Sequence, residues 1–293
     1  MRMSSTVGCA FLALGLPLGA LGCTVEAGEE PVGTTGEAVV RYPSGIPNGI
    51  QYGFQWTFGD YGTAHYLFPG LPSANLVACA LNTVGGTFVN ANDKIRVTRE
   101  ASGWSGYGSS GGGNPALDAM CFYLNGSTLG DEQVWDGTGT VTMMIGSNVA
   151  GANDTCFLTG LQGRFADGST NNVVRLQIVN GQWKFDGVGT GKKAWARCVN
   201  IPTVGTEGSW VAGLTTPPAI IMPPNMLTTE GSNGPRFCGL TRIHGQIQNG
   251  WTGTYVQQLP PYDPVSYYYY LGGARNPGFF FGNSIGSTSR CIQ

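Results

Sequence analysis

Cys156-Phe157-Leu158-Thr159, followed by Gly163 and Phe165 and closed by Cys198, is the stretch of sequence that decides the fold. Its frame, C-x-L-[TN]-x-x-x-G-x-[FI] and then a second cysteine, occurs three times. The copies run from Cys79 to Cys121, from Cys156 to Cys198 and from Cys238 to Cys291. Three copies in register predict a repeat protein, with units of about 75–80 residues that cover approximately residues 50–128, 129–203 and 204–293.

The patterns inside the units predict strands. In the second unit, the apolar-alternating runs 173–179 and 182–185 flank Asn180-Gly181, which is the strongest short signal for a β-hairpin. Near residue 52, large aromatic residues alternate with small or polar ones, which is typical of a strand with one aromatic face. No stretch shows helical periodicity. We therefore expect an all-β body in which three repeats pack with pseudo-threefold symmetry, as one prism-like or barrel-like domain, or stand in tandem as small modules.

The composition agrees with many short strands and turns. Charged residues make up 11% of the chain, against roughly 25% in an average soluble domain, and 48 of the 293 residues are glycine. The formal net charge is −2, and the only basic cluster along the sequence is Lys192, Lys193 and Arg197. This balance disfavours nucleic acid as a partner.

The first 22 residues have the features of an export signal. An uncharged apolar run follows Arg2 and is too short to span a bilayer. It ends in Ala20-Leu21-Gly22-Cys23, which resembles the lipobox of bacterial lipoproteins, although the first position of a lipobox is usually Leu. The resemblance implies cleavage before Cys23, acylation of that cysteine and, because Thr24 follows it, an outer-membrane or surface location. An ordinary secretory signal is the alternative.

The segment after the signal differs in composition from the rest of the chain. Residues 23–40 are rich in Glu and Gly, contain no aromatic residue, and are expected to form a flexible tether. The globular body is then residues 41–293.

The six cysteines of the body are expected to form disulfides, because their number is even and the chain is predicted to be exported. The frame favours pairing within each unit: Cys79–Cys121, Cys156–Cys198 and Cys238–Cys291. A second scheme would join neighbouring units instead: Cys121–Cys156, Cys198–Cys238 and Cys291–Cys79. A zinc site is disfavoured because the chain contains no C-x-x-C and only two histidines. We expect no metal and no cofactor.

The body is poor in side chains suited to catalysis. His65 and His244 occupy non-equivalent positions of the repeat, and each is interpreted as a structural residue. Five carboxylates are candidates for the acid pair of a glycan hydrolase, but they do not recur between units and are better explained by turns. These are Asp131, Glu132, Asp136, Asp154 and Asp167. The loops 90–93 and 153–154 are candidates for calcium sites, yet they lack the regular ligand spacing of an EF-hand loop, so turn chemistry is again preferred.

Aromatic residues in Gly-rich loops are the best candidates for a binding site. Trp104, Tyr107 and Trp251 lie in such contexts, where large rings stack on sugars or contact a protein partner. Alternatively, Trp104 and Trp183, which occupy similar repeat positions, cap the core. We expect an exported, surface-anchored binding protein without catalytic residues, whose ligand is carbohydrate or another surface protein. A structural matrix component and a carboxylate-dependent glycan hydrolase are the alternatives.

Overall fold

The computed structural model describes most of the predicted body. The described residues are 77–101, 103–124, 126–166, 172–211, 237–259 and 285–292, with the short strand segments 40–41, 52–56, 65–66, 219–220 and 268–272. All of them belong to one compact unit, Thr34–Gln293. The predicted signal peptide, Cys23 and nearly all of the predicted tether lie outside the described residues, so the lipid anchor stays a prediction.

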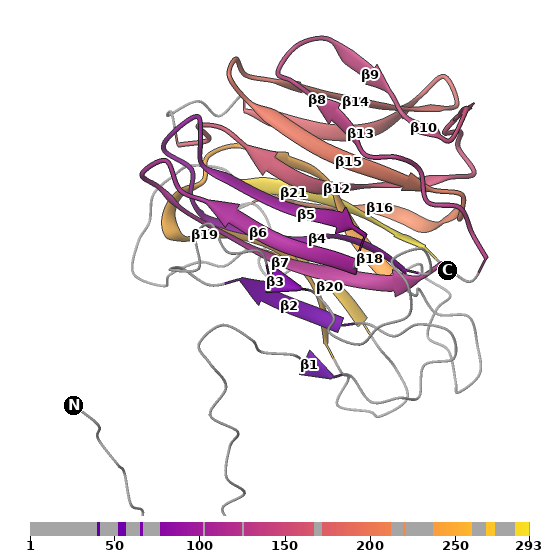
Figure 1. The fold of residues 1–293 in the computed structure, drawn as a ribbon, viewed down its shortest axis with the longest axis horizontal. Coiled ribbons are helices and arrows are strands. Elements are labelled where there is room, and N and C mark those ends of the chain that lie inside the picture. Colours follow the sequence, from indigo (N-terminus) through magenta and orange to yellow (C-terminus); the bar gives the residue numbers. More distant parts are fainter. Residues whose placement is uncertain are drawn as a thin grey trace, which may run out of the picture. The chain divides into compact units, whose positions relative to one another are not determined.

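The described chain is all-β (Figure 1), as the sequence predicts, and its elements are strands. They are β1 (Val40–Arg41), β2 (Tyr52–Trp56), β3 (His65–Tyr66), β4 (Val77–Thr87), β5 (Lys94–Glu100), β6 (Gly103–Ser109), β7 (Asn114–Tyr123), β8 (Gln133–Trp135), β9 (Thr140–Thr142), β10 (Met144–Ile145), β11 (Asn148–Val149), β12 (Thr155–Gln162), β13 (Val173–Val179), β14 (Gln182–Val188), β15 (Lys193–Val199), β16 (Thr203–Val211), β17 (Ala219–Ile220), β18 (Phe237–His244), β19 (Gln248–Leu259), β20 (Tyr268–Gly272) and β21 (Gly286–Ile292). The described residues contain no helix that is long and apolar enough to span a membrane.

Three large sheets contain all of these strands except the small β10–β11 hairpin. Sheet A has the order β1-β2-β7-β4-β19-β20-β17, sheet B the order β3-β6-β5-β12-β15-β8, and sheet C the order β16-β21-β18-β13-β14-β9. In each sheet, the strand with a first cysteine pairs on one side with the strand that carries the second cysteine. On its other side it pairs with a hairpin that comes from another part of the chain.

The exchange of hairpins between the sheets is cyclic. The hairpin β5–β6, which follows β4, joins β12 in sheet B. The hairpin β13–β14, which follows β12, joins β18 in sheet C. The hairpin β19–β20, which follows β18, returns to β4 in sheet A. Each sheet therefore depends on two distant stretches of sequence.

The disulfides follow the pairing within each frame. Cys79 bonds Cys121, Cys156 bonds Cys198 and Cys238 bonds Cys291, at sequence separations of 42, 42 and 53. In each case the two cysteines stand directly opposite each other on neighbouring antiparallel strands. The first pairing scheme is confirmed, and the scheme that joins neighbouring units is wrong.

The hairpin predicted at Asn180-Gly181 is also present. Strands β13 and β14 pair in the expected register, and both turn residues have positive φ, 51° for Asn180 and 75° for Gly181. Positive φ at both central residues is the requirement of a type I′ turn, which Asn-Gly meets at low cost. The apolar run 141–145 is divided between two strands. It forms β9 and β10 separated by the fully buried Met143, because β9 pairs with β14 whereas β10 turns back onto β11.

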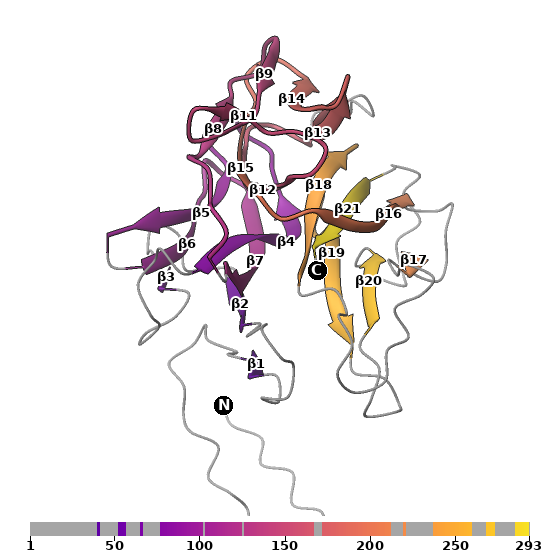
Figure 2. The same cartoon turned by 90° about the vertical axis from the view of Figure 1, so that its right-hand side faces the viewer.

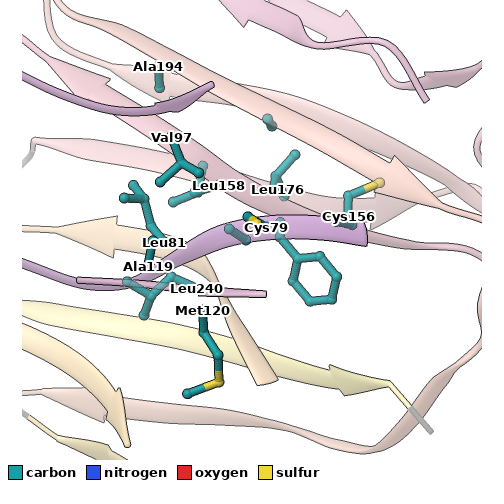
Figure 3. Close-up of a cluster of buried hydrophobic side chains, with 14 of the residues drawn as sticks. Cys79, Leu81, Val97, Ala119, Met120, Cys156, Leu158, Leu176, Ala194 and Leu240 are labelled. Carbon is teal, nitrogen blue, oxygen red and sulfur yellow. The ribbon is translucent and has the colours of Figure 1, made fainter. Parts of the chain in front are cut away.

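The core lies where the three sheets meet. Strands β4, β12 and β18 pack against one another (Figure 2), and the recurring leucines of the frame, Leu81, Leu158 and Leu240, are fully buried there (Figure 3). Three phenylalanines next to the frame cysteines are in mutual ring contact, with centroids 4.7–6.1 Å apart: Phe122, Phe157 and Phe237. The frame thus supplies the central packing of the body.

The last position of the frame, Phe or Ile, closes a ring of backbone hydrogen bonds. The N–H of Phe165 donates to the carbonyl of Phe88 at 2.9 Å, that of Phe88 to Ile247 at 3.1 Å, and that of Ile247 to Phe165 at 3.1 Å. All three side chains are fully buried. The frame positions therefore bond to one another across the three sheets.

Candidate functional site

Two of the three aromatic residues predicted to bind ligand have described side chains. Trp104 in β6 is only 3% exposed, and its indole N–H donates to the carbonyl of Val77 at 3.0 Å. Trp183 is fully buried in the same manner, with its N–H bonded to the carbonyl of Asp154 at 2.8 Å. Both rings cap the core, so Trp104 has no free face for a ligand. Trp251 lies in β19, and its side chain is outside the described set.

Tyr107, in contrast, keeps part of its surface exposed and belongs to a larger group on sheet B. The strand register places Tyr107 opposite Arg96, Arg96 opposite Gly160, and Gly160 opposite Trp195. The three larger side chains, Trp195, Arg96 and Tyr107, therefore lie in one row across four strands, on the same face of the sheet. We refer to them as the aromatic row.

Contacts within and beside the row hold it together. The Arg96 guanidinium lies 4.9 Å from the centroid of the Trp195 ring, and the Nζ of Lys94 lies 4.9 Å from that of Tyr107. Such cation–π contacts stabilise by roughly 0.5–1 kcal/mol at exposed sites. Gly160 makes the arrangement possible, because a Cβ there would stand 2.8 Å from the Trp195 ring and 3.0 Å from Arg96 Cγ.

Glu132 anchors the middle of the row. Its carboxylate forms an ion pair with Arg96 and also accepts a hydrogen bond from the Thr159 hydroxyl at 3.0 Å. The Glu132 side chain is 10% exposed and that of Arg96 is 26% exposed, so the pair is partly shielded from solvent. Burial lowers the pKa of Arg96, but the hydrogen bonds and charges of Glu132 and Tyr107 outweigh it and raise the pKa above its usual value. Arg96 is therefore a fixed cation.

Arg197 lies beside the row. Its Nη1 donates to the carbonyl of Gly130 at 3.0 Å, and its guanidinium stacks 5.6 Å from the centroid of Trp104. Within the described part of the chain, its buried Nε has no hydrogen-bond partner. Burial lowers the pKa of Arg197, and the charges of Arg99 and Arg96 lower it as well, against the opposing effect of Glu132 and Asp131.

The carboxylates considered for hydrolysis are dispersed. Glu132 is engaged by Arg96 and Thr159, Asp154 accepts the N–H of Gly151 at 2.7 Å, and Asp136 is exposed in a turn with Thr138. Asp131 is exposed, and Asp167 lies outside the described residues. Among the residues that the structure describes, no group of three or more His, Cys, Asp and Glu side chains has the arrangement of a metal site.

The loop 90–93, one of the two considered for calcium, is organised by hydrogen bonds. Asp93 is fully buried, and its Oδ2 accepts the N–H groups of Val89 and Asn90 at 2.7 and 2.8 Å. Its Oδ1 accepts those of Gly111 and Gly113 at 2.6 and 3.1 Å. The carboxylate thus joins the β4–β5 loop to the β6–β7 loop, which is turn chemistry extended across two loops.

His244 has surroundings that suit a structural role. Burial lowers its pKa and the charge of Arg242 lowers it further, so its imidazole is neutral at pH 7. Its strand β18 lies between β13 and β21 in sheet C, whereas the aromatic row is on sheet B. Only the backbone of His65, in β3, is described.

Comparisons with known proteins return nothing for this chain: no protein-family model, no curated protein and no solved structure matches it. The candidate site therefore rests on geometry alone. Sequence reasoning singled out Tyr107 as a candidate and considered Glu132 only as a carboxylate of a glycan hydrolase. It missed Arg96 and Trp195, because the residues of the site come from separate stretches of the chain. For Arg96, the only signal in the sequence was the nearness of charged and aromatic residues in β5 and β6.

On sheet A, the residue that stands three positions before the second cysteine is Asp118, whereas Trp195 holds that position on sheet B. The Asp118 carboxyl is enclosed by protein although part of the residue remains exposed. Burial raises its pKa to about 6, against the lowering effect of a hydrogen bond with Thr83. The protonated form is thus favoured in the folded state, and stability falls as the pH rises from about 4 to about 6.

We expect the variant Asp118→Asn to lose this dependence. At pH 7 it should be more stable than the wild type by about 3 kcal/mol, since the charged carboxylate is no longer buried. At about pH 3 and below, where the aspartic acid is mostly protonated in both the folded and the unfolded state, the two proteins should be nearly equally stable. Urea unfolding at pH 3, 5, 6 and 7 measures the difference. A difference between variant and wild type that does not change with pH would contradict the expectation.

Proposed function

We propose that this chain is an exported β-repeat protein that binds carbohydrate through the aromatic row on sheet B. The observation that carries the proposal is the register that places Tyr107 and Arg96, both partly exposed, beside Trp195, which is 7% exposed and supports Arg96 from below. A ring such as that of Tyr107, which can stack on the face of a sugar, next to Arg and Lys donors that bond its hydroxyl groups, forms a suitable chemistry for carbohydrate. A surface protein would be a second ligand for the same face.

Export is supported by the three disulfides, which persist in oxidising compartments and are rare in the cytosol. We propose that the anchor is a lipid on Cys23 and that the protein is held at the outer membrane or cell surface. Acyl-labelling of the expressed protein, and its loss in the variant Cys23→Ser, would test the anchor.

We also propose that the three frames are structural repeats around a pseudo-threefold axis. The cyclic exchange of hairpins and the ring of hydrogen bonds among Phe88, Phe165 and Ile247 support this arrangement. A further match supports it: Arg197 and Arg290, each directly before a second cysteine, stack on Trp104 and Trp183 of the neighbouring hairpin, with 5.6 and 5.1 Å to the ring centroids. On this basis, corresponding residues of sheets B and C can be compared.

A glycan array tests the carbohydrate proposal. We expect the wild type to bind at least one class of oligosaccharide, and Tyr107→Ala to lower that affinity at least tenfold, which corresponds to about 1.4 kcal/mol of lost stacking. Val188→Ala, an exposed side chain on sheet C, serves as the control and should bind like the wild type. Failure of the wild type to bind any glycan, or full binding by Tyr107→Ala, would refute the proposal.

A further inference from the structure

The two stacked arginines, Arg197 and Arg290, differ in how their charge is balanced. On sheet C, the Nε and Nη2 of Arg290 both bond to Glu207 Oε2, at 3.2 and 2.6 Å. Glu207 stands three residues before Trp210, and the residue three positions before Trp135 in the second unit is Glu132. By this correspondence, Glu132 would be the partner of Arg197.

Glu132 instead bonds to other residues. One of its oxygens pairs with Arg96 and the other accepts the hydroxyl of Thr159. Arg197 keeps only the carbonyl of Gly130 as a described hydrogen-bond acceptor, on Nη1, and its buried Nε is unpartnered within the described part of the chain. A buried donor without an acceptor costs free energy, and more so when it carries charge.

The surroundings add positive charge. Arg96, Arg99 and Arg197 form what we call the arginine cluster, and the charges of Arg96 and Arg99 both act on Arg197. The nearby carboxylates are those of Glu132, which is paired with Arg96, and Asp131, which is exposed. The Nε of Arg96 is also buried and unpartnered among the described residues.

We propose that the arginine cluster binds the carboxylate or sulfate group of an acidic sugar, whose ring lies against the adjacent aromatic row. This inference rests on the proposed function and deepens it, because it names an anionic glycan as the ligand class. A guanidinium presents parallel N–H donors that match the two oxygens of a carboxylate or sulfate. The anion takes the place at Arg197 that Glu207 occupies at Arg290.

Calorimetric titration with four probes tests the inference: a neutral glucan oligosaccharide, an oligogalacturonate, a sulfated oligosaccharide and inorganic sulfate. We expect the oligogalacturonate or the sulfated sugar to bind at least tenfold more tightly than the neutral one, with an affinity that falls as salt increases. Whichever of the two binds more tightly identifies the source of the anionic group.

Variants provide the controls. Arg197→Gln should lose at least tenfold in affinity for the acidic sugar and keep its affinity for the neutral one. Arg290→Gln, the matched arginine of sheet C, should bind both like the wild type. Because Arg197→Gln also removes the cation that stacks on Trp104, Arg197→Lys is included. It keeps the charge but not the planar donor pair, and should show an intermediate loss.

The outcomes separate the two proposals. Equal affinity for neutral and acidic sugars overturns the inference and leaves carbohydrate binding in place. So does a folded Arg197→Gln variant that binds the acidic sugar as tightly as the wild type. If inorganic sulfate binds to the wild type but not to Arg197→Gln, and no sugar binds, carbohydrate binding is overturned and only the anion site remains. Binding of none of the four probes overturns both.

Discussion

Replacing Asp93 with alanine is expected to lower the free energy of unfolding by about 4 kcal/mol, because it removes the acceptor of four backbone N–H groups at once. These donors belong to Val89, Asn90, Gly111 and Gly113, and the Asp93 side chain is fully buried. A small residue cannot replace the carboxylate, and the loops that it joins would have to open for water to reach the freed groups.

Graded variants sharpen this test. Asp93→Asn keeps one acceptor oxygen and turns an amide NH₂ toward two of the donors, so we expect it to cost about 2–3 kcal/mol. Asp154→Ala serves as the matched control, since its side chain accepts one backbone N–H, that of Gly151, and should cost about 1 kcal/mol. Urea unfolding monitored by tryptophan fluorescence gives all three values. An Asp93→Ala cost no larger than that of Asp154→Ala would show that the two loops do not depend on the carboxylate.

Removing one disulfide is expected to lower the free energy of unfolding by about as much as Asp93→Ala does. The double variant Cys156→Ala with Cys198→Ala opens a loop closed over 42 residues, for which the chain-entropy model gives about 4 kcal/mol. The double variants of Cys79–Cys121 and Cys238–Cys291 should lose nearly the same, because the model depends on loop length only through its logarithm.

Denaturant unfolding of the three double variants measures these losses. As a control, wild type and variant should approach each other in stability when the measurement is repeated after full reduction, since the bond is then missing from both. A loss below about 1 kcal/mol for the Cys156–Cys198 variant would contradict the entropic estimate. It would mean that residual contacts between the β12 and β15 segments restrict the denatured state even without the bond. A much larger loss for one bond than for the others would argue against equivalent roles in the three frames.

The residues that recur in the three frames and the residues of the candidate site occupy different kinds of position. Residues that recur in the frame, such as Leu158, Gly163 and Phe165, are buried or lie at turns, where the three sheets need the same packing. The row across each sheet differs between sheets. On sheet C, Arg175 lies opposite Asp186 rather than opposite an aromatic residue, and the two side chains form an ion pair at 2.5 Å. On sheet B, Arg96 faces Tyr107 instead. Function is therefore to be sought in the positions where the copies diverge.

Part of this site was open to sequence reasoning. Tyr107 was selected as a candidate because a large ring among Gly and Ser residues can stack on a sugar or contact a partner, and the structure leaves it partly exposed. Trp104 has the same sequence context and yet is buried, because the carbonyl of Val77 takes its N–H and Arg197 covers its ring. Local context cannot distinguish the two rings, since adjacent strand residues of opposite parity face opposite sides of a sheet and the exposed side depends on what packs against it.

The sequence by itself determined the all-β class and the hairpin at Asn180-Gly181, and it favoured the disulfide partners that the structure shows over those of the second scheme. Each of these depends on a local turn preference, on alternation within one strand, or on a frame repeated in register. Only the tertiary structure decided which hairpin joins which sheet, and hence that Arg96 lies against the ring of Trp195 and pairs with Glu132. The physical reason is that strands are joined through backbone N–H and C=O groups, which every residue except proline carries alike, so the sequence has no mark of which distant strand will be the neighbour.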